Sequence, residues 1–141
     1  MPETFRNPDP AAIRALLKSV RTIAVVGLSP NPRRPSHGVS RALQQFGYRV
    51  IPVRPAVDAV LGEKAYPTLS AVAEPFDLVD VFRSPEHVAP LVDECIRLGV
   101  KALWLQDGVV DEAAAERARA AGITVVMDRC IYRDYIALCQ D

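Results

Sequence analysis

No apolar run in this 141-residue sequence approaches the roughly 20 residues that a membrane-spanning helix needs. The first residues, MPETFRNPDPAAIR, also lack the basic and then apolar segments of a secretory signal. The three cysteines, Cys95, Cys130 and Cys139, are odd in number and scattered along the chain. These absences favour a protein without membrane contacts in a reduced, cytoplasmic setting.

Net charge is absent as well, since Lys and Arg together equal Asp and Glu. Neither the whole chain nor any expected helix is strongly basic, which argues against a nucleic-acid partner. The charges are nevertheless unevenly placed, because residues 1–70 hold ten Lys/Arg against four Asp/Glu. Such a bias is typical either of scattered, solvated side chains or of a fold whose first half binds an anionic ligand.

Apolar runs alternate with helical patterns along the chain. The runs predict five buried strands, at 22–27, 48–53, 77–82, 101–106 and 123–128. Apolar residues at helical spacing predict helices at 9–20, 36–47, 84–99, 111–122 and 130–140. Uniformly apolar strands separated by helices are typical of a parallel sheet with right-handed crossovers. We therefore expect one α/β domain over residues 1–141, a doubly wound parallel five-stranded sheet of Rossmann type.

Polar residues, glycines and prolines locate the helix ends. Asp9, Ser36 and Ser84 are expected N-caps. Pro90 lies inside a helical pattern, so the first turn of that helix is expected to be distorted. The weaker stretch at 60–74 is expected to hold a short strand followed by one or two helical turns.

The expected binding edge is the carboxyl end of the sheet, as in other doubly wound folds. Both common phosphate fingerprints are missing there, because the glycine after Gly27 is Gly38 and no G-K-[ST] occurs. Arg54 follows the second strand, where NAD sites usually carry an acid. An arginine favours a nucleotide with a ribose phosphate, such as NADP or coenzyme A; the alternative is a solvated loop arginine.

The stretch AVVGLSPNPRRPSHGVSRALQQFGYRVIPVRP, followed by VDVFR and VVMDRC, closely resembles the small stand-alone CoA-binding proteins. These are similar in turn to the CoA-binding domain of the succinyl-CoA synthetase alpha subunit. The resemblance covers residues 15–139 and implies coenzyme A at the carboxyl edge of a Rossmann sheet. The residues that it places at the cofactor are Gly27, Ser29, Arg33, Arg34, Ser36, Val53, Phe82, Arg83 and Ser84. Arg54 joins them on its charge alone, because the family often has Asn there.

The remaining reactive or polar residues are isolated. Cys130 follows the last strand at the expected edge, but no His or Lys partner is evident in the sequence, so a structural role is favoured over a reactive thiol. Cys95 and Cys139 are expected in the core, and no cysteine or histidine spacing fits a metal site. Asp80 and Asp128 are expected to hydrogen-bond backbone or arginine, with a ligand hydroxyl as the alternative.

The sequence thus predicts a protein that binds CoA or acyl-CoA and has no identifiable catalytic residues. Three alternatives stay open at this point: an NADP-dependent reductase, an enzyme that uses acyl-CoA, and a nucleotide-responsive sensor that acts through a partner. A homo-oligomer and association with a larger ligase are both compatible with the pattern.

Overall fold

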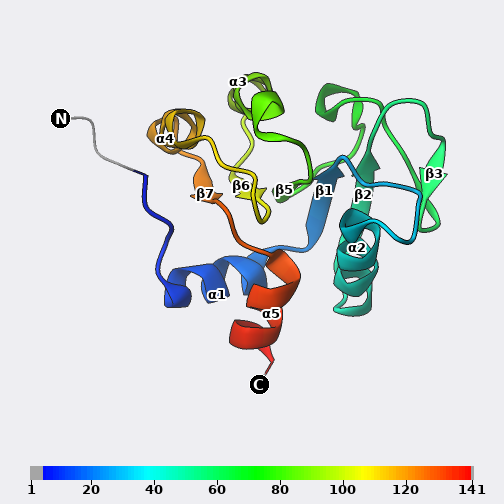
Figure 1. Ribbon diagram of the computed structural model, residues 1–141, viewed down its shortest axis with the longest axis horizontal. Helices are drawn as coiled ribbons and strands as arrows, with labels where there is room; N and C mark the ends of the chain where they lie inside the picture. The colour runs from blue at the N-terminus through cyan, green and yellow to red at the C-terminus, as the bar shows by residue number, and fades with distance from the viewer. Residues whose placement is uncertain (1–4, 141) are drawn as a thin grey trace.

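The computed structural model describes residues 5–140 and contains a five-stranded sheet with helices on both faces (Figure 1). The strands are β1 (Thr22–Val26), β2 (Arg49–Val53), β5 (Leu78–Val81), β6 (Ala102–Leu105) and β7 (Thr124–Val126). Their order is β2-β1-β5-β6-β7, and every neighbouring pair is parallel. The predicted doubly wound fold is confirmed. Its strand order reverses between β1 and β5, the point at which such sheets bind ligands.

Two helical layers cover the apolar faces of the sheet. One layer consists of α1 (Pro10–Ser19), α2 (Pro35–Gln45) and α5 (Ile131–Cys139), and the other of α3 (Val88–Leu98) and α4 (Glu112–Ala120). Each layer buries its own cluster of aliphatic side chains against the strands. This two-sided burial explains why the strands carry continuous apolar runs rather than alternating ones.

Side-chain capping fixes the start of α1 but not the starts of α2 and α3. The Asp9 side chain accepts a hydrogen bond from Ala12 N at 2.8 Å, as predicted for the N-cap of α1. Ser36 was expected to cap α2, but the helix begins at Pro35 with Arg34 as N-cap. Ser84 precedes a 3₁₀ turn, η2 (Pro85–His87), and α3 begins only at Val88. The distorted helix start expected from Pro90 is therefore present.

The segment between β2 and β5 folds back along the sheet. The short strand expected there is a hairpin of β3 (Ala59–Val60) and β4 (Glu63–Lys64), followed by the 3₁₀ turn η1 (Leu69–Ala71). Tyr66 forms a parallel bridge with Val53. Its backbone N–H donates to Pro52 O at 3.0 Å, and its carbonyl accepts from Arg54 N at 2.7 Å. These bonds fix the backbone on which Arg54 is mounted.

Within residues 5–140, no helix is both long and apolar enough to cross a lipid bilayer.

Candidate functional site

An open cleft with a volume of about 990 Å³ lies at the carboxyl edge of the sheet. Its walls come from the loop after β1, the first turn of α2, and the loops after β2, β5 and β6, with Cys130 before α5. The cleft therefore spans the point at which the strand order reverses, the edge to which the sequence pointed.

Most of the residues expected at a cofactor line this cleft. They are Gly27, Ser29, Arg34, Ser36, Arg54, Phe82, Arg83 and Ser84. Arg33 and Val53 are not among the wall residues. The side chain of Arg33 is exposed, whereas Val53 is buried at the end of β2.

Gly27 joins the ends of three strands at the bottom of the cleft. Its N–H donates to Val53 O at 2.9 Å, while Phe82 N donates to Val26 O at 2.9 Å. Gly27 has a φ of +86°, and a Cβ atom built on it would lie 2.3 Å from Phe82 O. Only glycine fits this approach, because any side chain would collide with the backbone after β5.

Side-chain hydrogen bonds hold the loop after β1 in shape. Ser29 N donates to Ser36 Oγ at 3.0 Å, and Asn31 N donates to Ser29 Oγ at 3.1 Å. Arg33 N donates to Asn31 Oδ1 at 3.0 Å. Each serine hydroxyl accepts within the loop and still has its own O–H to donate. The loop therefore presents hydroxyl donors beside the start of α2.

The cleft carries positive charge that the neighbouring residues do not neutralise. Arg34, Arg54 and Arg83 line it, and within residues 5–140 no carboxylate forms an ion pair with Arg34 or Arg54. The one acidic wall residue, Asp107, is paired with Arg133 at 2.8 Å. The first turn of α2 adds little to this charge, because Pro35 has no N–H and the N–H groups of His37 and Gly38 donate to Arg34 O at 3.1 and 3.3 Å. Among the described residues, the N–H of Ser36 is the helix-start donor without an acceptor. This donor set fits a ligand with several anionic groups.

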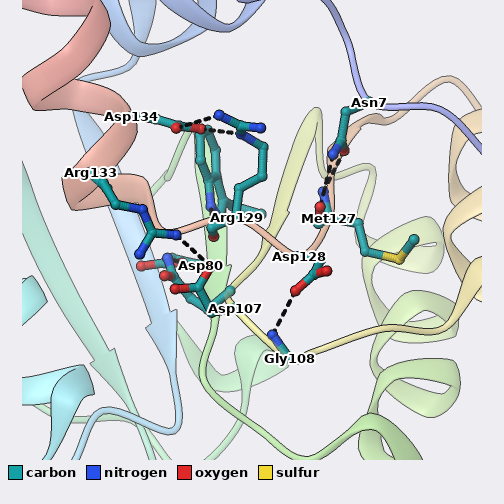
Figure 2. Close-up of polar contacts among 11 residues, drawn as sticks. Asn7, Asp80, Asp107, Gly108, Met127, Asp128, Arg129, Arg133 and Asp134 are labelled. Carbon is teal, nitrogen blue, oxygen red and sulfur yellow. Dashed lines mark hydrogen bonds and ion pairs between the residues drawn. The ribbon is translucent and has the colours of Figure 1, made fainter.

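The loop between β7 and α5 is fixed by a separate network (Figure 2). Arg129 forms two hydrogen bonds to the buried carboxylate of Asp134, at 2.6 and 2.8 Å. Its carbonyl accepts from Trp104 Nε1 at 2.8 Å. Asp128 Oδ1 accepts from Gly108 N at 2.8 Å, which confirms the backbone bond expected for this residue. The network holds Cys130, the N-cap of α5, half-buried in the cleft wall.

The other cysteines lie away from the cleft, as predicted. Cys95 and Cys139 are buried in the two core clusters. Burial raises the pKa of the Cys95 thiol to about 12, so this side chain is protonated under ordinary conditions. Among the described residues, no cluster of His, Cys, Asp and Glu could hold a metal ion.

Gln106 is a wall residue that sequence reasoning missed. Its Nε2 donates to Asp80 Oδ1 at 2.5 Å, and both residues are buried. Asp80 was expected to hydrogen-bond backbone or arginine; the Val81 backbone does contribute, but the larger effect comes from the side chain of Gln106. The register of β5 against β6 places Asp80 opposite Trp104, two residues before Gln106. The available signal was a polar residue directly after an apolar strand at the binding edge.

Known proteins share both sequence and fold with this chain. The family model of a CoA binding domain matches residues 21–135. The uncharacterized protein YneT of Bacillus subtilis is 42% identical over 127 residues, which cover 90% of this chain and 94% of YneT. A hypothetical protein from Pyrococcus horikoshii has the same fold, with a TM-score of 0.91, 33% identity, and 99% and 100% of the two chains covered.

A more distant relative is much larger. The ADP-forming acetate–CoA ligase I of Archaeoglobus fulgidus is 24% identical over 121 residues, which cover 79% of this chain but only 18% of the ligase. The matched part of this chain therefore spans less than a fifth of that enzyme's length.

Proposed function

We propose that this chain, which belongs to the family of CoA binding domains, binds coenzyme A in the cleft at the carboxyl edge of its sheet. The observation that carries the proposal is the pair of cleft arginines, Arg34 and Arg54, with which no carboxylate of residues 5–140 forms an ion pair. Coenzyme A has a pyrophosphate and a separate ribose phosphate, so it offers more than one anionic group to such a site. Arginine is well suited to both, because its planar guanidinium can donate two parallel hydrogen bonds to a phosphate.

The pyrophosphate is assigned to the loop after β1 and the start of α2. Arg34 supplies the charge there, while the hydroxyls of Ser29 and Ser36 and the backbone N–H of Ser36 supply further donors. Gly27 contributes by letting the end of β1 pack against the backbone of Phe82 at the bottom of the cleft, where a side chain would collide.

The ribose phosphate is assigned to Arg54. Its backbone is held by Tyr66, and its side chain is half-exposed in the cleft wall. The remaining wall, formed by Phe82, Arg83 and Ser84, is assigned to the rest of the cofactor. Arg33 and Val53 were expected at the cofactor only from their position in the sequence. Because Arg34 lines the cleft and Arg33 does not, Arg34 is the better candidate for the pyrophosphate.

The site has no nucleophile and base in hydrogen-bond contact among the described residues, so we propose binding rather than turnover. Calorimetric titration with CoA, acetyl-CoA, NADP and NAD tests this. CoA or acetyl-CoA should bind more tightly than either dinucleotide. If NADP or NAD binds more tightly, the cleft serves a redox cofactor instead, and the proposal is wrong.

The two phosphate assignments can be separated with dephospho-CoA, which lacks the ribose phosphate. Arg34→Ala should weaken both ligands by roughly 10- to 150-fold, the equivalent of about 1.5–3 kcal/mol for a hydrogen bond to a charged group. Arg54→Ala should weaken CoA by a similar factor but leave dephospho-CoA unchanged. Arg41→Ala, an exposed arginine of α2 outside the cleft, is the matched control.

A further inference from the structure

A buried carboxylate lies beneath the cleft and takes no part in the proposed phosphate contacts. Asp80, in the central strand β5, is fully buried and lies in register with Val25 and Trp104. Its Oδ1 accepts the hydrogen bond from Gln106, whereas its Oδ2 has no partner among the described residues. Such atoms are rare in folded proteins, because leaving a buried polar group unpaired is costly.

Gln106 connects this carboxylate to the cleft. It directly follows β6, and its backbone N–H donates to Val81 O at 3.3 Å. Its side chain is 4% exposed and forms part of the cleft wall. A side-chain amide has a donating N–H₂ and an accepting oxygen on opposite sides. Because Nε2 is turned to Asp80, Oε1 is the atom left for a ligand.

We infer that Asp80 is a positioning residue that turns Oε1 of Gln106 toward the cleft, where it accepts a hydrogen bond from a secondary amide N–H of the ligand. This inference rests on the proposed binding of CoA, whose pantetheine arm carries secondary amides. A ligand carbonyl would require the opposite orientation, with the N–H₂ of Gln106 toward the cleft.

The orientation of Gln106 depends on the protonation of Asp80. Burial raises the pKa of Asp80 to about 7, against the opposing effects of hydrogen bonds from the Gln106 side chain and the Val81 backbone. An ionised carboxylate only accepts, so Gln106 must donate to it; a protonated carboxyl can donate to Oε1 and leave the N–H₂ facing the cleft. An amide N–H of the ligand therefore binds best to the form with ionised Asp80. Affinity is expected to increase as the pH rises through about 7.

Neighbouring charges do not cause the raised pKa of Asp80. The pKa of Asp80 is set by burial and hydrogen bonds rather than by a neighbouring charge. Asp107 and Asp134 are each engaged with an arginine. The helices α1, α2 and α5 cover this face, and the loops after β1, β5, β6 and β7 border it. Their titratable and charged groups include Arg14, Lys18, Arg33, Arg34, His37, Arg41, Arg83, Asp107, Asp128, Arg129, Cys130, Tyr132, Arg133, Asp134, Tyr135 and Cys139.

The binding test uses dephospho-CoA, because the phosphate monoester of CoA itself titrates near pH 6. The wild-type protein should bind it roughly 3- to 10-fold more tightly at pH 8 than at pH 6, as expected for one neutral hydrogen bond. Asp80→Asn should keep the affinity at pH 8 but lose the dependence on pH, since an asparagine oxygen still accepts and does not titrate. Gln106→Met should weaken binding at pH 8 by the same factor and also lose the pH dependence. Gln45→Met, an exposed residue of α2, should behave as wild type.

A measurement on the ligand-free protein separates this inference from the proposed function. The side-chain ¹⁵N–¹H signals of Gln106, identified by their loss in Gln106→Met, should shift with a midpoint near pH 7 in wild type and stay constant in Asp80→Asn. If these signals do not titrate, or if wild type and Asp80→Asn bind with the same pH profile, the inference is overturned. If the signals titrate but neither CoA nor dephospho-CoA binds, the proposed function has failed, and the role given to Oε1 fails with it.

Discussion

Replacement of Gly27 by alanine tests the geometry at the bottom of the cleft. The backbone at this position has a φ of +86°, which costs an L-residue about 1 kcal/mol. The added methyl would lie 2.3 Å from Phe82 O. A backbone oxygen cannot rotate away as a flexible side chain can, so the end of β5 must move, at a cost of about 1–3 kcal/mol. The free energy of unfolding should therefore fall by about 2–4 kcal/mol, a large share of the usual 5–15 kcal/mol.

Gly38→Ala provides the matched control. Gly38 lies in α2, and a Cβ atom there would have no neighbour within 4 Å. Alanine should stabilise this position by about 0.5–1 kcal/mol because it restricts the unfolded chain. Urea denaturation measures both variants, and a shifted midpoint with an unchanged slope reports stability. If Gly27→Ala unfolds at the wild-type midpoint, the Phe82 backbone does not exclude a side chain at position 27. If Gly38→Ala is destabilised as much as Gly27→Ala, the loss at position 27 cannot be attributed to the contact with Phe82. CoA affinity should fall in Gly27→Ala alone, because Phe82 and Arg83 line the cleft.

Further variants test charge, ionisation and reactivity. Asp80→Asn should gain stability relative to wild type as the pH rises from about 4 to 8. The pKa of Asp80 is about 7 in the folded protein, above its unfolded value, so its contribution to stability is complete below the unfolded pKa and is lost as the pH rises through the folded pKa. The difference in the free energy of unfolding can reach about 4 kcal/mol. Denaturation midpoints at several pH values check this, and parallel curves would contradict it. Arg33→Ala should weaken CoA binding less than Arg34→Ala in calorimetry, because Arg34 lines the cleft and Arg33 does not. The reverse order would assign the phosphate to Arg33 instead. Cys130→Ser should bind CoA like wild type, and neither protein should release free thiol from acyl-CoA; release by wild type alone would identify a catalytic cysteine.

The sheet could be predicted from the sequence because each of its strands is an apolar run long enough to be covered on both faces. The expected strand at 77–82, for example, is β5 at Leu78–Val81. The start of α2 could not be assigned correctly, because Ser36 is a favoured N-cap residue whereas the actual N-cap, Arg34, makes no side-chain capping hydrogen bond. Ser36 Oγ instead accepts from Ser29 N, a bond between loop and helix that sequence spacing does not show.

Residues that line the cleft could be predicted where they directly follow a strand of the sheet. They were missed where their position depends on packing between neighbouring strands. The loop after β1 and Arg54 lie on the cleft because they follow strands of a parallel sheet. The contact between Asp80 and Gln106 joins residues far apart in the chain and depends on the register of β5 against β6. That register is a property of the folded sheet, so the sequence showed only a solitary acid among apolar neighbours.

The two outer strands of the sheet have a consequence for self-association. Unpaired backbone groups at a sheet edge can recruit a strand from another chain. At the outer side of β2, Tyr66 already occupies the donors and acceptors next to Pro52 and Arg54. At the end of β7, the side-chain amide of Asn7 makes the two hydrogen bonds that a neighbouring strand would make. Its Nδ2 donates to Met127 O at 2.9 Å, and its Oδ1 accepts from Met127 N at 2.7 Å. Both borders of the sheet are thus occupied next to the cleft, and copies of this chain are expected to meet through their helical layers rather than by joining sheets.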